Sequence, residues 1–330
     1  MDIQLLKQAV PLVIGWYRLC KRDLPWRNNR TPYTALVAEL MLQQTRVEAV
    51  KERFVEFLRR FPSPEALAMA SEDEVLKAWE GLGYYSRAKH LHAAARVIAA
   101  QGFPSDFRGV RALPGVGDYT AGAICSIALG LPEPAVDGNV LRVLTRLFAD
   151  GSNIDELATK KRFSEALRAV YPPDTADFCE GLMELGALVC VPNGAPNCKE
   201  CPWQALCRAH LAGREEDFPV RSEKKARRVV PLTVVVLQKD GRYAIQKRGK
   251  GLLAGLWEFP NFEGEAPDFG EIEEEKRAVH IFTHVEWRMT GRLIQAREFF
   301  PEYLWVTAEE IGQTYALPSA FKAFKEWVTS

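Results

Sequence analysis

The chain has 330 residues, of which 47% are hydrophobic, with 43 Lys or Arg and 43 Asp or Glu. This length suits two or three domains with well-formed cores. No stretch of about 18 uninterrupted apolar residues occurs, which excludes a membrane span, and the first residues lack the layout of a secretory signal. We therefore expect a soluble, cytoplasmic protein that is monomeric by default.

The neutral total conceals an uneven distribution of charge. Residues 1–60 hold 11 basic and 6 acidic residues, and residues 221–228 hold five basic residues and one acidic residue. Residues 261–275, by contrast, hold seven acidic residues and no basic one. A locally basic surface is compatible with nucleic-acid binding, although solvated charged faces explain the same counts.

Hydrophobic periodicity predicts a mainly helical region over residues 1–212 and a different architecture after it. Residues 213–230 are polar and charged without apolar periodicity and predict a linker. Two strands are predicted at 232–237 and 243–246 around an Asp240-Gly241 turn, so that residues 231–330 form an α+β domain. Helices are predicted at 5–16, 47–58, 71–79 (opened by a capping box), 141–148, 155–170, 175–188 and 319–328.

A glycine-rich turn, Leu113-Pro-Gly-Val-Gly117, leads directly into an apolar helix. Glycines let the backbone approach a phosphate closely, and a helix N-terminus offers free N–H groups. The turn therefore predicts a sequence-independent contact with a DNA backbone, with an ordinary helix corner as the alternative.

Two carboxylates are candidates for catalysis. Asp137 precedes the helix at 141–148, where capping hydrogen bonds would keep its carboxylate ionised. Glu39 stands in an otherwise apolar run, where burial would raise its pKa and let it act as a general acid. A plain helix cap and a surface glutamate remain the alternatives.

Four of the seven cysteines lie within 18 residues. This clustering, without a secretory signal, indicates metal binding rather than disulfides. A structural zinc site usually pairs two short knuckles, and only one Cys-x-x-Cys pair is present. The candidate ligands are Cys190, Cys198, Cys201 and Cys207, and we expect Cys20, Cys125 and Cys179 to be buried thiols.

Residues 113–123 resemble the hairpin of the helix-hairpin-helix DNA glycosylases, the superfamily of endonuclease III. The resemblance implies two helical domains with DNA held between them. Tyr119 stands where strand-cutting members carry a lysine that forms a Schiff base. A tyrosine cannot form one, so the resemblance implies an enzyme that releases a base and leaves the strand intact.

Residues 39–45 resemble the signature of the adenine DNA glycosylases within that superfamily. The resemblance implies that adenine is flipped out of the duplex, that Glu39 protonates it, and that Asp137 stabilises the sugar. Tyr119 and Asn139 would orient the reacting groups. Contacts with DNA are implied for Gln44, Thr45, Leu82, Tyr84, Gly115, Val116 and Gly117, and contacts with adenine for Trp26 and Arg27.

The same family resemblance extends to the cysteines and to the C-terminal domain. It implies a 4Fe–4S cluster bound by Cys190, Cys198, Cys201 and Cys207. Seven residues separate Cys190 from Cys198, one more than is usual in the family, and a turn at Asn193-Gly194 would accommodate the extra residue. Zinc and free thiols are the alternatives. Residues 255–260 resemble a Nudix-like fold that lacks the metal-binding frame of Nudix hydrolases. Its 8-oxoguanine-sensing loop would be Phe282, Thr283 and His284, with threonine in place of the common serine.

The sequence thus predicts a monofunctional glycosylase that hydrolytically removes adenine opposite 8-oxoguanine or guanine in double-stranded DNA. Two alternatives remain open. A thymine or uracil mismatch glycosylase should lack the Glu39 signature and the C-terminal domain. A non-catalytic lesion-binding protein has no need for both Glu39 and Asp137.

Overall fold

The computed structural model describes residues 1–223 and 226–329. It divides into two compact units. The first is Met1–Ala68 with Ala93–Glu223, and the second is Met69–His92 with Lys224–Ser330. The linker predicted at 213–230 therefore includes two positions, 224 and 225, outside the described residues. None of the helices in the described ranges combines the length and apolar content that crossing a bilayer requires.

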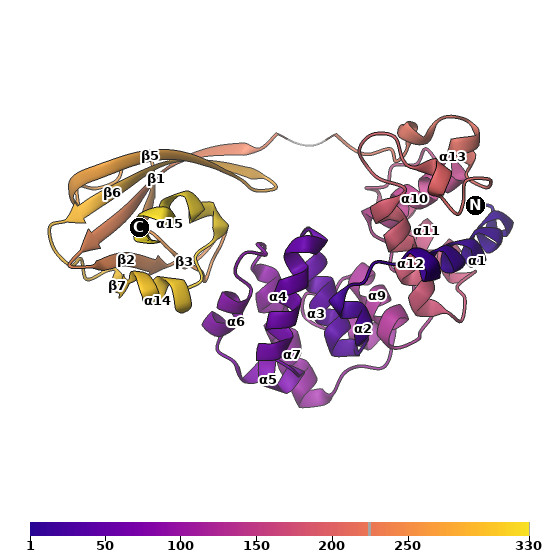
Figure 1. Ribbon diagram of the computed structural model, residues 1–330, viewed down its shortest axis with the longest axis horizontal. Helices are drawn as coiled ribbons and strands as arrows, with labels where there is room; N and C mark the ends of the chain where they lie inside the picture. Colours follow the sequence, from indigo (N-terminus) through magenta and orange to yellow (C-terminus); the bar gives the residue numbers. More distant parts are fainter. Residues whose placement is uncertain (224–225, 330) are drawn as a thin grey trace. The chain divides into compact units, whose positions relative to one another are not determined.

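The first unit is helical (Figure 1, indigo to pink). Helix α1 packs on α12, α3 packs on α9, and α12 also contacts α9 and α10. These contacts bring the ends of α3, α9, α10 and α12 together around one pocket. Its elements are α1 (Ile3–Cys20), α2 (Pro25–Asn28), α3 (Pro32–Leu42), α4 (Val47–Arg60), α5 (Pro64–Met69), α7 (Ser86–Gln101, shared with the second unit), α8 (Phe107–Ala112), α9 (Asp118–Ala128), α10 (Gly138–Phe148), α11 (Leu157–Arg168), α12 (Thr175–Leu188), η1 (Cys198–Glu200), α13 (Arg208–Leu211) and η2 (Glu215–Asp217).

The second unit contains a mixed sheet with the path β3-β2-β1-β6-β5, in which β1 and β6 run parallel and the other pairs are antiparallel. Helix α15 covers one face of the sheet (Figure 1), where Phe324 and Val328 share a core with Val234 of β1. Its elements are α6 (Glu72–Ala78), β1 (Arg228–Lys239), β2 (Arg242–Lys247), β3 (Trp257–Glu258), β4 (Asn261–Glu263), β5 (Gly270–Ile281), β6 (Val285–Ala296), β7 (Leu304–Thr307), α14 (Ala308–Gln313), η3 (Ser319–Phe321) and α15 (Lys322–Thr329).

Local sequence signals explain several element boundaries. Ser71 and Glu74 form the predicted capping box of α6. Asp240 (φ 48°) and Gly241 (φ 72°) both adopt the left-handed conformation that a tight hairpin turn between β1 and β2 requires. The strand β1 begins at Arg228, so the last three residues of the predicted linker belong to the sheet.

Candidate functional site

One pocket of the first unit gathers most of the predicted catalytic and base-binding side chains, although they are far apart in sequence. These side chains differ in burial and in hydrogen bonding. The pocket is lined by Trp26, Arg27, Glu39, Thr45, Tyr119, Asp137, Asn139, Glu180, Met183 and Glu184, together with smaller apolar residues.

Glu39 is the buried acid of this pocket. Its side chain is in the middle of α3, and the residue is only 6% exposed. Burial raises the pKa of Glu39 to about 7; the carboxylates of Asp137 and Glu180 act in the same direction, and a hydrogen bond with Tyr119 opposes them. Its Oε2 atom has no hydrogen-bond partner among the described residues. Such a carboxyl group can hold a proton near neutral pH and donate it to a bound base.

Asp137 caps the N-terminus of α10 and is held from two sides. Its Oδ1 accepts a 2.8 Å hydrogen bond from the backbone N–H of Val140, and its Oδ2 accepts a 2.7 Å bond from Nδ2 of Asn139. These two hydrogen bonds fix the orientation of the carboxyl group. The pocket therefore pairs a buried acid with an oriented carboxylate.

Tyr119 supplies a hydroxyl group that hydrogen-bonds with Glu39. It lies in the first turn of α9 and donates a 3.7 Å hydrogen bond to Sδ of Met183. Burial and the nearby Glu39 and Asp137 raise the pKa of Tyr119 well above its ordinary value. Its hydroxyl therefore stays protonated, and it cannot form a Schiff base because that requires an amine, which tyrosine lacks.

Two further carboxylates line the pocket, and the sequence reasoning missed them. Glu180 accepts a 2.7 Å hydrogen bond from the hydroxyl of Tyr17 and also pairs with Arg30. Glu184 binds Arg22 at 2.8 Å and Arg27 at 2.9 Å, which holds the pKa of Glu184 near 2 despite burial. Their i, i+4 spacing in the otherwise apolar stretch 178–188 was the signal that could have revealed them.

Trp26 and Arg27 form one wall of the pocket. Trp26 is buried and packs edge-on against Phe54, with ring centroids 5.6 Å apart. Arg27 is anchored by Glu184 at 2.9 Å, and its buried Nε atom lies 3.6 Å from Oε1 of Glu180 in a second ion pair. Arg27 is therefore held in the pocket wall by two buried carboxylates.

The glycine-rich turn presents backbone rather than side chains. Gly115 has a φ of 75°, which favours glycine, while Val116 is buried and anchors the turn. Gly117 precedes α9 without a side-chain cap, so the first N–H groups of α9 are available to an anion.

Gln44 and Thr45 follow the end of α3. Gln44 is exposed and has a φ of 54°, an uncommon conformation for a residue other than glycine. The adjacent Gln43 fixes this corner through a 3.1 Å hydrogen bond from Nε2 to Oγ1 of Thr120. Backbone strain held in place by its surroundings is typical of functional positions.

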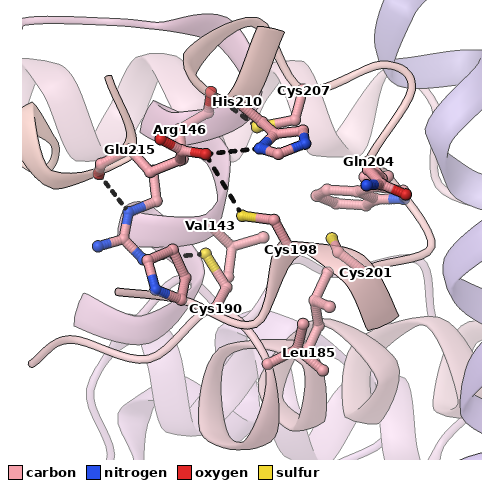
Figure 2. Close-up of a pocket in the computed structure, with 13 residues that line it drawn as sticks. Val143, Arg146, Leu185, Cys190, Cys198, Cys201, Gln204, Cys207, His210 and Glu215 are labelled. Atoms are coloured by element: carbon pink, nitrogen blue, oxygen red, sulfur yellow. Dashed lines mark hydrogen bonds and ion pairs between the residues drawn. The ribbon is translucent and has the colours of Figure 1, made fainter. Parts of the chain in front are cut away.

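The four clustered cysteines converge on a second pocket in the first unit (Figure 2). Apolar side chains, among them Val143 and Leu185, line it with them. Burial raises the pKa of Cys198 to about 11 and that of Cys201 to about 12. These thiols are therefore protonated at neutral pH unless a bound cation displaces their protons. Four thiols that converge on one pocket fit an iron–sulfur cluster, and Arg146, His210 and Glu215 line the same pocket. Cys198, His210 and Glu215 also lie within ligand distance of one another and form a mixed set in which a single metal ion could bind.

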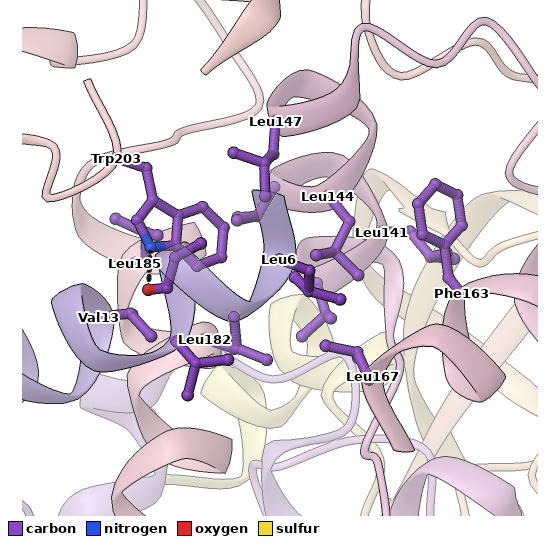
Figure 3. Close-up of a cluster of buried hydrophobic side chains, with 14 of the residues drawn as sticks. Leu6, Val13, Leu141, Leu144, Leu147, Phe163, Leu167, Leu182, Leu185 and Trp203 are labelled. Carbon is purple, nitrogen blue, oxygen red and sulfur yellow. Dashed lines mark hydrogen bonds between the residues drawn. The ribbon is translucent and has the colours of Figure 1, made fainter. Parts of the chain in front are cut away.

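The cysteine loop is fixed to the helical core by Trp203. Its indole Nε1 donates a 2.7 Å hydrogen bond to the carbonyl oxygen of Ala9 in α1 (Figure 3). The ring is buried among Leu6, Val13 and Leu185 and their neighbours. The loop is therefore part of the folded core rather than an appended segment.

Arg142 connects the cysteine loop to the catalytic pocket. This buried side chain donates 2.8 Å bonds to the carbonyl oxygens of Cys190 and Gly186 and a 3.1 Å bond to Oδ1 of Asn139. Asn139 in turn binds Asp137. The orientation of Asp137 thus depends on side chains that also hold the first cysteine.

The predicted recognition loops of the second unit lie together. Leu82 is buried, whereas Tyr84 is 46% exposed and has a φ of 46°. The Tyr84 hydroxyl is 3.1 Å from Oγ1 of Thr283, at hydrogen-bond distance. Thr283 and His284 are exposed in the β5–β6 turn, and Phe282 packs against Trp287 with centroids 4.9 Å apart.

One expectation about the remaining cysteines is wrong. Cys125 and Cys179 are buried as predicted, but Cys20 is exposed. It is the last residue of α1, at the end of the helix where the apolar face no longer meets a partner.

Comparisons with known proteins agree with this geometry. Residues 37–169 match the family model described as HhH-GPD superfamily base excision DNA repair protein, and residues 232–327 match the NUDIX domain model. The adenine DNA glycosylase of Arabidopsis thaliana is 38% identical over 91% of this chain, which spans 53% of that relative's length. The adenine DNA glycosylase of Buchnera aphidicola (from Acyrthosiphon pisum) is 31% identical over 88% of both chains. The solved structure of a thermostable thymine-DNA glycosylase covers 63% of this chain with a TM-score of 0.58 and 28% identity.

Proposed function

The chain belongs to the adenine DNA glycosylase family of base excision repair enzymes, and on that premise we propose that it excises adenine mispaired with 8-oxoguanine or guanine without cutting the strand. The observation that carries the proposal is the pairing of Glu39 and Asp137 in one pocket. Their environments differ, one buried and the other capped by hydrogen bonds. Opposite environments on two carboxyl groups indicate an acid and a charge-stabilising partner.

In this mechanism the flipped adenine occupies the pocket beside Trp26 and Arg27. Glu39 donates its proton to a ring nitrogen of adenine, and the N-glycosidic bond breaks with its electron pair leaving on the base. Asp137 stabilises the resulting cationic sugar. A water molecule then adds to the sugar carbon and passes its proton to the Glu39 carboxylate, which regenerates the acid, and Tyr119 and Asn139 orient the groups around it.

Backbone and wedge contacts would hold the distorted duplex. The glycine-rich turn at Gly115, Val116 and Gly117, with the uncapped N-terminus of α9 that follows it, suits a phosphate, and Gln44 is exposed beside the catalytic pocket next to Thr45. Inserting a side chain into the base stack helps to offset the cost of unstacking, a few kcal/mol per step. Tyr84, rather than the buried Leu82, is the exposed side chain suited to this role in the second unit.

Recognition of 8-oxoguanine is assigned to Phe282, Thr283 and His284. Threonine provides the same hydroxyl donor and acceptor as serine. Its hydrogen bond to Tyr84 joins this loop to the proposed wedge. We place the loop in a Nudix-like domain at 231–330, joined by the linker at 213–230 to a glycosylase region at 1–212.

Cys190, Cys198, Cys201 and Cys207 are the proposed ligands of a 4Fe–4S cluster. When bound, such a cluster cross-links the loop and can exchange an electron. The residues themselves support a structural role, because Trp203 and Arg142 join the loop to α1 and to the pocket.

A substrate comparison tests the proposal. Base release is followed in four labelled duplexes. The first three carry adenine opposite 8-oxoguanine, opposite guanine and opposite thymine, and the fourth carries thymine opposite guanine. Excision of adenine from the first two duplexes only is expected. Release of thymine would favour the mismatch thymine glycosylase, and tight binding without release would favour a recognition protein.

A further inference from the structure

A charged seam joins the segment 69–92 to the C-terminal domain within the second unit. It consists of Asp73, Lys77 and Glu80 on the helical side and of Lys247 and Lys325 on the other. Lys247 binds both carboxylate oxygens of Asp73, at 2.8 and 3.0 Å. These residues are distant in sequence from the loop at 282–284.

Lys77 is the most enclosed member of the seam, with a side chain 12% exposed. Its Nζ atom binds Glu80 at 2.7 Å and donates to the carbonyl oxygens of Tyr315 at 3.1 Å and Ile311 at 3.4 Å. These carbonyls lie at the C-terminal end of α14, where a cation is favoured by the helix dipole. Lys77 thus anchors α6 against the C-terminal domain.

Glu80 is shared by two lysines. Besides Lys77, its carboxylate accepts a 3.4 Å hydrogen bond from Lys325 of α15. The Glu80 side chain is 21% exposed, so the three charges are partly shielded from solvent. Shielded ion pairs with several partners constrain geometry more than isolated surface pairs do.

Glu80 directly precedes the loop that ends in Tyr84, and side-chain hydrogen bonds brace this loop. Trp79 donates from Nε1 to the carbonyl oxygen of Gly83 at 3.2 Å. The buried guanidinium of Arg87 donates 3.0 Å bonds to the carbonyl oxygens of Leu82 and Gly83. A braced loop transmits a shift of Glu80 to the Tyr84 hydroxyl, which meets Thr283 at 3.1 Å.

We propose that Lys77, Glu80 and Lys325 are positioning residues that set Tyr84 against Thr283 and thereby favour 8-oxoguanine over guanine opposite the target adenine. This inference rests on the proposed function. None of the three residues needs to contact DNA for it to hold. Weakening the seam lets the Tyr84–Thr283 pair drift, which reduces the preference between lesions without altering the catalytic pocket.

The test measures single-turnover excision of adenine opposite 8-oxoguanine and opposite guanine in the full-length, cluster-loaded protein. Lys77→Met, Glu80→Gln, Lys325→Met and the double variant Glu80→Gln/Lys325→Met are compared with Glu309→Gln. Glu309 is an exposed residue of α14 that bonds Gln313 and lies outside the seam. Melting temperatures are recorded for all variants, so that only folded proteins enter the comparison.

The ratio of the two rates should fall about fivefold in Glu80→Gln, the scale of one partly shielded ion pair, and stay unchanged in Glu309→Gln. Because Glu80 and Lys325 act together, the double variant should lose no more than the stronger single variant. Unchanged ratios in folded seam variants would overturn the inference. A wild-type protein that fails to excise adenine opposite 8-oxoguanine would instead overturn the proposed function.

Discussion

The side-chain amide of Asn139 donates a 2.7 Å hydrogen bond to Oδ2 of Asp137. The other carboxylate oxygen is held by the backbone N–H of Val140, so both oxygens of Asp137 are oriented by the first turn of α10. Arg142 holds Asn139 in turn, at 3.1 Å. The proposed charge-stabilising group is thus positioned by its neighbours before any substrate binds.

Replacing Asn139 with alanine should misorient Asp137. We expect the single-turnover rate of adenine excision to fall up to about 100-fold, as small misplacements of catalytic groups do. Affinity for the duplex should change little, because the glycine-rich turn and the wedge residues remain. Rates and binding measured on the same duplex check this, and equal losses in both would assign Asn139 to DNA binding instead.

The rate should depend on pH through Glu39. The acid acts only when protonated, and its pKa is about 7, so excision should slow as pH rises through 7. Glu39→Gln should abolish excision while leaving DNA binding intact. A pH–rate profile from pH 5.5 to 9 is the measurement, and a rate that stays flat across this range would remove Glu39 from the role of acid.

Glu39 should also make folding stability depend on pH. Its folded pKa of about 7 lies above the ordinary 4.5, so between these values the folded state binds more protons than the unfolded state. Stability therefore falls as pH rises through this window. Glu39→Gln removes this titrating group, so its free energy of unfolding should not show this fall. Relative to wild type, the free energy of unfolding of the variant should rise by up to about 3 kcal/mol as pH increases from 4.5 to 8. Urea unfolding at both pH values tests the trend.

Arg142→Met should destabilise the cysteine loop and the catalytic pocket together. The change leaves the buried carbonyl oxygens of Cys190 and Gly186 without their donor, at about 1–3 kcal/mol for each unsatisfied group. Arg162→Met is a matched control, because Arg162 pairs with Asp150 at a partly exposed site of α11. Unfolding free energies should separate the two variants, and similar small losses would contradict the role of Arg142.

Metal analysis distinguishes the possible occupants of the cysteine pocket. Protein purified without oxygen should contain about four iron and four sulfide ions per chain. Cys201→Ser should lower both together and reduce stability, whereas Cys20→Ser, at an exposed position, should change neither. About one zinc ion per chain would instead favour a mononuclear site, for which Cys198, His210 and Glu215 are the additional candidates.

Local signals in the sequence predicted much of the fold. The capping box at Ser71 and the Asp240-Gly241 turn depend on neighbouring residues, and both are confirmed. The parallel pairing of β1 with β6 and the association of residues 69–92 with the C-terminal domain depend on contacts between distant segments, which periodicity does not encode.

The candidate site shows the same division. Glu39 was noticed as a lone carboxylate in an apolar run, and the catalytic role of Asp137 was predicted from the resemblance to the glycosylase family. Glu180 and Glu184 were missed because their partners, Tyr17 and Arg22, come from a helix and a loop about 160 residues earlier. The seam at Lys77 was equally invisible, since two of its acceptors are backbone carbonyl oxygens.

In the proposed mechanism, Glu39 and Asp137 release adenine opposite 8-oxoguanine and leave the strand intact. The decisive measurement of this mechanism is single-turnover strand breakage in a labelled duplex with one adenine–8-oxoguanine pair, with and without hot alkali. The Asp137→Asn variant and an adenine–thymine duplex are the controls. Breakage only after alkali, only opposite 8-oxoguanine and absent in the variant is the predicted result. No breakage by folded, DNA-binding protein, or undiminished breakage by Asp137→Asn, would contradict the account.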